Sequence, residues 1–414
     1  RNISPENFGC VEAAGLGLDD HTDDLQQAKK AMFASSRVVQ EDEISMDTLP
    51  EAVPAGSDSG AVEVATTLPT IFQARHVYSD DGNAFGYLRI YSFNIDNADE
   101  FVDEMRRLLG SLPQNGLIID LRGNGGGLIH AAERALGLLS PRPVEPEPAQ
   151  FINTPATLRL CRRHSVSQRL QGLVLEPWLD SIERSVASGA THSLGFPITP
   201  PEDCKRTGQQ YQGPKVLIVD GLCYSAADMF IAGFKDHDLG WIIGLHDSTG
   251  AGGANVWSHR LLRSLAVDQP GPGGLRRLPG GADLRIAVRR TLRVGPNAGE
   301  VIEDFGIEPD QIHLMTENDI EGKNEDLIAT AVEALQRLPC YRLSVTRDHD
   351  AVDVDAPGAD WVQVMRAERP LGTFDLDSTG RTRLAGERLG APGQEIEFAA
   401  YADGQPVAST RLIL

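Results

Sequence analysis

An apolar strand that runs directly into a cluster of glycines constrains the fold of this chain more than any other feature. The stretch GLIIDLRGNGGG, residues 116–127, places Asp120, Arg122 and Asn124 before three consecutive glycines. A turn ordinarily needs one glycine, and glycines at the carboxyl end of a parallel strand let backbone N–H groups face a ligand. Taken alone, the three glycines fit a tight strand-to-helix turn equally well. No Gly-Lys-Ser/Thr follows and the GxGxxG spacing is absent, so the loop does not predict phosphate binding.

The segments around this loop alternate between strand and helix patterns. Before it, a predicted hairpin turns at residues 81–83 and leads into a helix over NADEFVDEMRRLLGSL, whose apolar residues recur at helical spacing. After it, two further helix and strand pairs follow, with the sequences GLIHAAERALGLL, KVLIVD, SAADMFIAGFKDH and GWIIGL. This order predicts an α/β core, in which crossover helices connect a mostly parallel sheet.

Changes in composition divide the chain into three regions. Residues 1–67 are acidic and polar, contain a helical pattern in DDLQQAKKAMFA, and include the linker-like PEAVPAGSDSG. The α/β pattern covers residues 68–338, and a Pro-rich, irregular segment at about 141–213 with an amphipathic piece indicates an insertion. Residues 341–414 alternate apolar and polar residues with period two, which predicts a small all-β sandwich as an accessory domain.

Composition excludes several classes of function. The net charge is −21 and no run of Lys and Arg is present, so we expect no nucleic-acid partner. The five cysteines form no CxxC pair, which argues against a structural zinc site, and their odd number prevents complete pairing. No apolar run approaches the roughly 20 residues of a membrane span. The chain begins at Arg1 without a methionine, so the lack of a signal peptide says nothing about export.

A second feature, Ser225, lies between a predicted strand and a predicted helix. It fits a helix N-cap, with Asp228 three residues later completing a capping box. It also fits a nucleophile at the positive end of the helix, where the N–H of Ala226 can bind an oxyanion. Spacing alone favours the cap.

Both features resemble motifs of the tail-specific, or C-terminal processing, serine protease family. LIIDLRGNGGG is similar to that family's D-L-R-x-N-x-G-G, and CYSAADMFIAGFKDH is similar to its Ser-Ala-Ser-Ala-Ser-Glu helix start, whose nucleophilic serine falls on Ser225. The resemblance covers roughly residues 68–338. It implies a crotonase-like or ClpP-like core and a serine endopeptidase that cleaves protein or peptide substrates through an acyl-enzyme. It implies no metal or organic cofactor and favours a secreted or periplasmic location.

The sequence resembles the branch of that family that uses Ser, His and Glu. Ala251 stands where the Ser-Lys members have their lysine, and Lys235 has the sequence context of a solvated helix face. STGAGG is similar to the TAGAGG of the tricorn and chlamydial-factor-like proteases, and VIEDFGIEPD places the branch's glutamate on Glu303. Glu303 also fits a simple turn residue before Gly306. The resemblance assigns the oxyanion hole to the N–H groups of Ala226 and Gly126.

The histidine of this branch is not identified among the ten in the chain. The family places it before a peptide-binding insert, upstream of the region that matches. His21 has acidic neighbours but resembles a solvated surface residue, and no role follows for His76, His130 or His237. We expect the chain to be truncated upstream of Arg1, so that the histidine is missing. Two alternatives stay open: a non-catalytic peptide- or lipid-binding relative, and a crotonase-like acyl-thioester enzyme.

Overall fold

The computed structural model describes residues 62–79, 81–164, 175–253, 256–265, 275–321 and 324–414. The predicted helix in DDLQQAKKAMFA and the candidate His21 lie outside the described residues. Within this part of the chain, no helix is long and apolar enough to cross a membrane.

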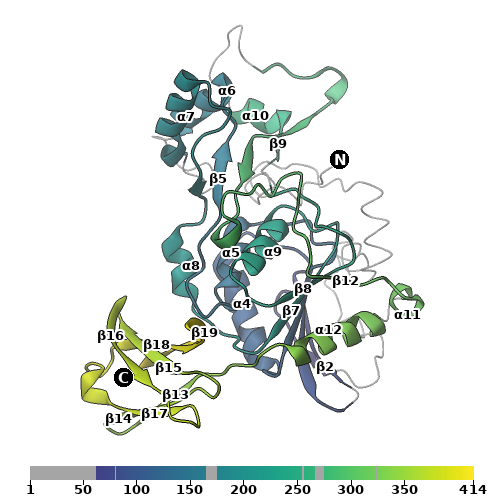
Figure 1. Cartoon of the computed structure of the whole chain (residues 1–414). Coiled ribbons are helices and arrows are strands. Elements are labelled where there is room, and N and C mark those ends of the chain that lie inside the picture. Colours follow the sequence, from purple (N-terminus) through teal and green to yellow (C-terminus); the bar gives the residue numbers. More distant parts are fainter. Residues whose placement is uncertain (1–61, 80, 165–174, 254–255, 266–274, 322–323) are drawn as a thin grey trace.

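A seven-stranded mixed sheet forms the centre of the molecule (Figure 1). Its strands in spatial order are β1 (Glu63–Val64), β2 (Phe72–Tyr78), β3 (Ala84–Ile90), β4 (Leu117–Asp120), β7 (Lys215–Val219), β8 (Trp241–Gly244) and β12 (Gln311–Ile312). The first three strands pair antiparallel, and from β3 onward every pair is parallel. The predicted hairpin and the α/β class are therefore confirmed, and the sheet is mixed.

Helices cover both faces of this sheet, which explains why consecutive residues are apolar in β4, from Leu117 to Ile119, and in β7, from Val216 to Val219. Helices α4 (Ala98–Ser111), α5 (Ile129–Leu136) and α9 (Ala226–Asp236) pack with Leu117 and Ile119 in one core. Helix α12 (Glu325–Arg337), preceded by the short α11 (Glu317–Ile320), covers the other face and packs with Ile118. A parallel strand buried on both faces needs such a continuous apolar sequence.

The predicted insertion is more regular than its proline content indicates. It holds β5 (Pro148–Phe151), α6 (Pro155–His164), α7 (Glu176–Ser188), β6 (Phe196–Pro197) and α8 (Pro201–Thr207). The region around α6 and α7 forms an upper lobe (Figure 1). This lobe also contains β11 (Arg289–Thr291), the paired strands β9 (Val256–Ser258) and β10 (Arg285–Ala287), and α10 (His259–Leu265). Its own aromatic core around Trp178 and Trp257 supplies the burial that orders these residues.

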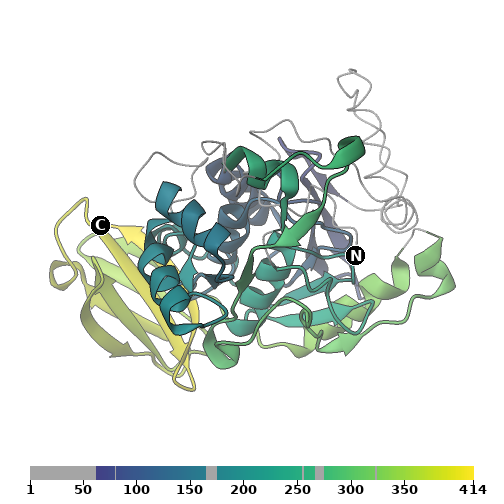
Figure 2. The ribbon, with the colours of Figure 1, turned by 90° about the horizontal axis from the view of Figure 1, so that it is seen from above.

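The C-terminal strands form two antiparallel sheets around one apolar core. One sheet contains β13 (Ser344–Asp348), β14 (Ala351–Asp355) and β17 (Arg381–Ala385); the other contains β16 (Arg369–Asp375), β15 (Trp361–Arg366), β18 (Glu395–Ala402) and β19 (Gln405–Ile413). Buried side chains alternate along β14 and β15, as the period-two pattern requires. Figures 1 and 2 place these sheets and α11 on opposite sides of the molecule. That residues 341–414 act as an independent accessory domain stays a prediction.

Two glutamines of the α/β core hold the C-terminal sheets. Gln212 accepts the N–H of Leu343 and donates to the carbonyls of Leu343 and Ser409 at distances of 2.8, 3.2 and 3.2 Å. Gln209 accepts the N–H of Ser409 at 2.7 Å. Each of these hydrogen bonds reaches a backbone atom of β19 or of the residue that precedes β13.

A buried carboxylate at the end of β4 joins several elements. Asp120 is 0% exposed and binds the guanidinium groups of Arg89 and Arg122 and the hydroxyl of Tyr87. Burial alone would raise the pKa of the Asp120 carboxyl, but the charges of Arg122 and Arg89 hold that pKa well below its ordinary value. Arg122 also donates to Asn324, the N-cap of α12, at 2.8 Å.

We predict that Asp120→Asn lowers the free energy of unfolding by about 3–5 kcal/mol, because it leaves two buried guanidinium groups without their counter-charge. Chemical denaturation at neutral pH measures this loss. Asp103→Asn removes an exposed i,i+3 pair with Arg106 and serves as the control, with an expected change below about 0.5 kcal/mol. Equal stability of the two variants contradicts the central role of Asp120.

Candidate active site

Ser225 occupies a strained turn between β7 and α9, at the carboxyl edge of the parallel strands. Its backbone has φ 56° and ψ −121°, and its side chain makes no capping hydrogen bond to α9. The residue is 4% exposed, and its N–H donates to the carbonyl of Gly252 at 3.2 Å. A non-glycine residue with positive φ costs about 1–3 kcal/mol and persists where surrounding contacts enforce it. The side chain of Ser225 therefore does not cap the helix.

Asp228 is bound to a neighbouring loop. Its carboxylate accepts hydrogen bonds from the hydroxyl of Thr249 and, at 2.8 Å, from the N–H of Gly252. Complete burial raises the pKa of Asp228 to about 7, while the hydrogen bonds from Thr249 and Gly252 act in the opposite direction. Asp228 thus fastens the loop of residues 249–253 to the first turn of the helix that follows Ser225.

The glycine loop lies against Ser225. Gly126 has φ 102°, and a Cβ atom on it would lie 2.7 Å from the Cβ of Ser225 and 3.0 Å from the nitrogen of Ala226. Gly127 has φ 137°, and a Cβ atom there would lie 2.1 Å from the carbonyl carbon of Phe93. Both approaches exclude a side chain. The structure therefore brings together Gly126, Ser225 and Ala226, which the sequence analysis selected from distant segments.

The N–H of Gly126 already has an acceptor in this structure. It donates to Oδ1 of Asn124 at 2.9 Å, while Nδ2 of Asn124 donates to the carbonyl of Ile90 at 3.0 Å. Asn124 is 0% exposed, and its carbonyl accepts the N–H of Tyr224 at 3.1 Å. Ala226 is the first residue of α9, where N–H groups have no acceptor inside the helix. Of the two predicted oxyanion donors, Gly126 must exchange a partner before it can bind another oxygen.

Glu303 lies beside the same loop that Asp228 holds. Its two carboxylate oxygens accept the N–H of Thr291 at 2.8 and 3.0 Å. Burial raises the pKa of Glu303 to about 7, and the charge of Asp228 acts in the same direction. The next residue, Asp304, donates its N–H to the carbonyl of Ala251 at 3.2 Å. Gly306 closes a turn onto Ile302 at 2.9 Å, so Glu303 is a turn residue whose side chain is largely buried.

Neither Lys235 nor Lys215 replaces a histidine at Ser225. Lys235 donates to the carbonyl of Glu308 at 2.6 Å on the outer side of α9. Burial lowers the pKa of Lys215 to about 8, but this residue begins β7 and so lies at the opposite edge of the sheet from Ser225. Its ammonium group donates to the carbonyl of Gly213 at 3.0 Å.

No histidine in the described part of the chain is hydrogen-bonded to Ser225 or Glu303. Both ring nitrogens of His237 are used, Nδ1 with the carbonyl of Gly233 at 2.8 Å and Nε2 with the N–H of Glu145 at 2.9 Å. His130 lies in the first turn of α5, where burial lowers its pKa, and His76 lies in β2. The structure thus gives His237 a structural role and leaves the general base unassigned.

Two site residues were missed as such by the sequence analysis. Asn124 was noted only as part of the loop, although its side chain orders the glycines. Asp228 was interpreted as a capping partner because S-x-x-D has the spacing of a capping box. In the structure its carboxylate instead accepts hydrogen bonds from Thr249 and Gly252, which lie more than 20 residues away in the sequence. Local spacing could not reveal contacts at that separation.

Comparisons with known proteins identify one family and several solved structures. The profile of "Peptidase family S41" matches residues 84–312, which include the glycine loop, Ser225 and Glu303. No curated protein matches the sequence. Members of family S41 are serine peptidases.

Three of the similar solved structures have TM-scores below 0.5. Mature CPAF is 20% identical over 63% of this chain and 53% of its own, with a TM-score of 0.45. The photosystem II D1 C-terminal processing protease is 18% identical over 58% and 46%, with a TM-score of 0.32. The tricorn protease is 15% identical over 64% and 23%, with a TM-score of 0.29. The chain thus spans about half the length of mature CPAF.

The raised pKa values of Asp228 and Glu303 predict how stability depends on pH. A carboxyl group whose pKa is higher in the folded state binds its proton more tightly there, so stability falls as pH rises from about 4 through 7. Each pKa unit corresponds to ~1.4 kcal/mol, so the effect of one such buried group is several kcal/mol. We expect Asp228→Asn to flatten the decline of Tm between pH 5 and 8. The exposed Glu333→Gln should keep the original slope, and an unchanged slope in Asp228→Asn contradicts the assignment.

Proposed function

Because the chain belongs to peptidase family S41, we propose that it is a serine endopeptidase that cleaves peptide bonds through an acyl-enzyme on Ser225. The family agrees with the resemblance of the two motifs described above. The observation that supports Ser225 most strongly is its strained, buried turn packed directly against Gly126. A serine that only caps a helix needs neither a positive φ nor a glycine loop on its Cβ atom.

In the proposed reaction, Oγ of Ser225 attacks the carbonyl carbon of the scissile peptide as a base removes its proton. The carbonyl oxygen becomes an oxyanion, which the N–H of Ala226 stabilises at the positive end of α9. The base then gives its proton to the leaving amine, and the acyl-enzyme forms. Water, deprotonated by the same base, hydrolyses the ester and restores Ser225.

We assign the second oxyanion donor to Gly126. Its N–H points to Asn124 in the structure, and a rotation of the peptide between Gly125 and Gly126 would release it toward the oxyanion. Glycines on both sides of this peptide keep the rotation free of side-chain clashes. Asn124 would then be a positioning residue that holds the loop before substrate binds.

Glu303 is assigned to the carboxylate that orients the base. Support comes from its place beside the loop of residues 249–253, which accepts the N–H of Ser225, and from the charge coupling between Glu303 and Asp228. A partly buried carboxylate at such a position holds an imidazole in one tautomer and stabilises its charged form. The base itself, an imidazole in this proposal, is not assigned to a described residue.

One observation favours a second candidate, a non-catalytic peptide-binding relative. Within the described residues, no histidine bonds to Ser225 or Glu303. A chain that binds peptides without cleaving them would retain the fold and lack covalent reactivity. An acyl-thioester enzyme gains nothing from this observation, because that chemistry gives the strained Ser225 no role.

We predict that a fluorophosphonate probe modifies Ser225 in the full-length protein, because a serine activated for acyl transfer attacks phosphorus in the same way. Mass spectrometry of the digested protein locates the adduct. Ser225→Ala should abolish labelling, while the exposed Ser111→Ala should leave it unchanged. Peptide hydrolysis that persists in Ser225→Ala overturns the assignment; absence of both labelling and hydrolysis in the unchanged protein favours the peptide-binding candidate.

We predict that Glu303→Gln lowers turnover by on the order of 10⁴, the loss seen when the orienting carboxylate of a serine protease becomes an amide. The amide oxygen still accepts the N–H of Thr291, and the amide has no charge for burial to oppose, so at neutral pH the variant should be at least as stable as the original protein. Steady-state kinetics and thermal unfolding measure the two effects. Glu308→Gln and Lys235→Ala are the controls and should remain within a few fold of the original turnover. Full turnover in Glu303→Gln, or its loss in Lys235→Ala, shows that a different base system operates.

A further inference from the structure

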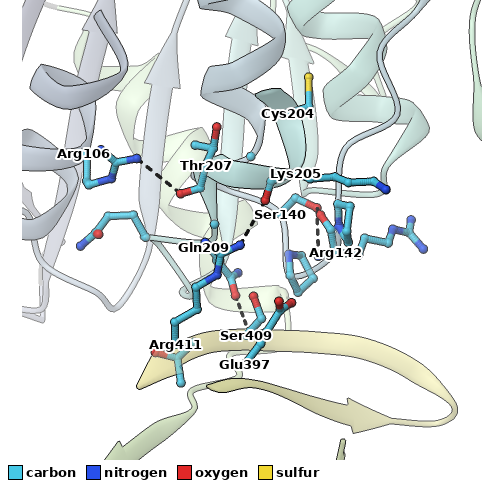
Figure 3. Close-up of a pocket in the computed structure, with 16 residues that line it drawn as sticks. Arg106, Ser140, Arg142, Cys204, Lys205, Thr207, Gln209, Glu397, Ser409 and Arg411 are labelled. Atoms are coloured by element: carbon cyan, nitrogen blue, oxygen red, sulfur yellow. Dashed lines mark hydrogen bonds between the residues drawn. The ribbon is translucent and has the colours of Figure 1, made fainter. Parts of the chain in front are cut away.

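A pocket of about 240 Å³ lies where the α/β core meets the C-terminal sheets (Figure 3). One wall comes from α4, α8 and the segment after α5, and the other comes from β18 and β19. In Figure 3, Arg411, Ser409 and Glu397 extend from the C-terminal strands toward Gln209 and Ser140 of the core. Two parts of the chain that fold around separate cores therefore complete one pocket.

The charge of this pocket is opposite to that of the whole chain. Four cationic side chains line it, namely Arg106, Arg142, Lys205 and Arg411, and its only acidic lining residue is Glu397. The chain carries a net charge of −21, so such a cluster does not follow from composition. A concave surface lined by one sign of charge concentrates the electrostatic potential and attracts the opposite charge.

Backbone carbonyls contact the guanidinium groups of Arg411 and Arg106, and Arg106 also donates to the exposed carboxylate of Asp103 at 2.6 Å. Arg411 donates to the carbonyls of Lys205 and Arg206 at 3.1 and 3.3 Å, and Arg106 donates to the carbonyl of Thr207 at 3.4 Å. The carbonyls at the end of α8 carry no full charge and so do not neutralise either guanidinium group. Because a guanidinium group has five N–H donors, each retains donors beyond these contacts.

The nearest carboxylates neutralise these cations only weakly. The side chains of Asp103, Glu368 and Glu395, which pair with Arg106, Lys205 and Arg411, are 72%, 82% and 59% exposed. Water screens pairs at such exposure, and they contribute little. Arg142 donates to the carbonyl of His237 at 3.0 Å, another neutral acceptor. The pocket thus retains an excess of positive charge.

We propose that this pocket binds a small, multiply charged anion that carries phosphate or carboxylate groups. Its volume lies below the roughly 300–1,000 Å³ of pockets for drug-sized ligands, so the ligand is small. Guanidinium groups match the geometry of phosphate and carboxylate oxygens and bind both with paired hydrogen bonds. Since both walls contribute charges, the bound anion bridges the C-terminal sheets to the core. The proposal is independent of the peptidase function.

Calorimetric titration of the whole protein with inorganic pyrophosphate and with citrate, at low salt, tests this site. We expect saturable binding, a Kd that rises with added salt, and a higher Tm in the presence of the anion. Binding of pyrophosphate alone identifies a phosphate-bearing ligand, binding of citrate alone a carboxylate-bearing one, and binding of both their shared chemistry. Lack of saturable binding by either anion overturns the proposal.

Charge variants distinguish binding in this pocket from nonspecific electrostatic attraction of the anion to the protein. Lys205→Gln, whose side chain makes one weak pair at 3.8 Å, should fold normally and raise Kd by about tenfold. Glu397→Gln removes the carboxylate of the pocket and should lower Kd. Arg337→Gln, an exposed arginine on α12, is the matched control and should leave Kd unchanged. Equal Kd values for Lys205→Gln, Glu397→Gln and Arg337→Gln overturn the pocket as the binding site.

Discussion

The carboxylate of Asp120 lies between two guanidinium groups at 0% exposure, and four parts of the fold meet on it. Strand β3 supplies Tyr87 and Arg89, β4 supplies Asp120 itself, the glycine loop supplies Arg122, and Arg122 reaches the N-cap of α12. A buried ion cluster of this kind is costly to desolvate, and each member depends on the others for its charge to be tolerated. The position of the glycine loop follows from this cluster, because the loop begins at Arg122.

A series of direct contacts connects the glycine loop to the candidate site. Asn124 fixes the glycines, Gly126 packs on Ser225, and Asp228 ties the next turn of the helix to residues 249–253. The strained backbone of Ser225 persists because these neighbours leave it no relaxed alternative. Two carboxyl groups, those of Asp228 and Glu303, are buried in this region, and burial raises the pKa of each.

Much of this fold can be predicted from the sequence, since β4 and β7 each contain a continuous apolar run and the apolar residues of α5 and α9 recur at helical spacing. The motifs also lead to Ser225, Ala226 and Gly126, which the structure brings together. The insertion was harder to predict, because its helices are ordered by an aromatic core whose members come from separate segments. The same limit applies to Asp228 and to the bond between Gly126 and Asn124, where local spacing admits several partners and only the folded geometry selects one. The histidine cannot be derived from the described residues at all.

The glutamines that hold the C-terminal sheets recognise only main-chain atoms of β19 and of the segment before β13. Such hydrogen bonds fix the position of the strand backbone and do not depend on the side chains of the strand. A substitution at Leu343 or Ser409 therefore leaves these hydrogen bonds in place unless it introduces proline, which would remove the donating N–H. These bonds therefore require particular side chains on the core side, Gln209 and Gln212, and only a particular backbone path on the other.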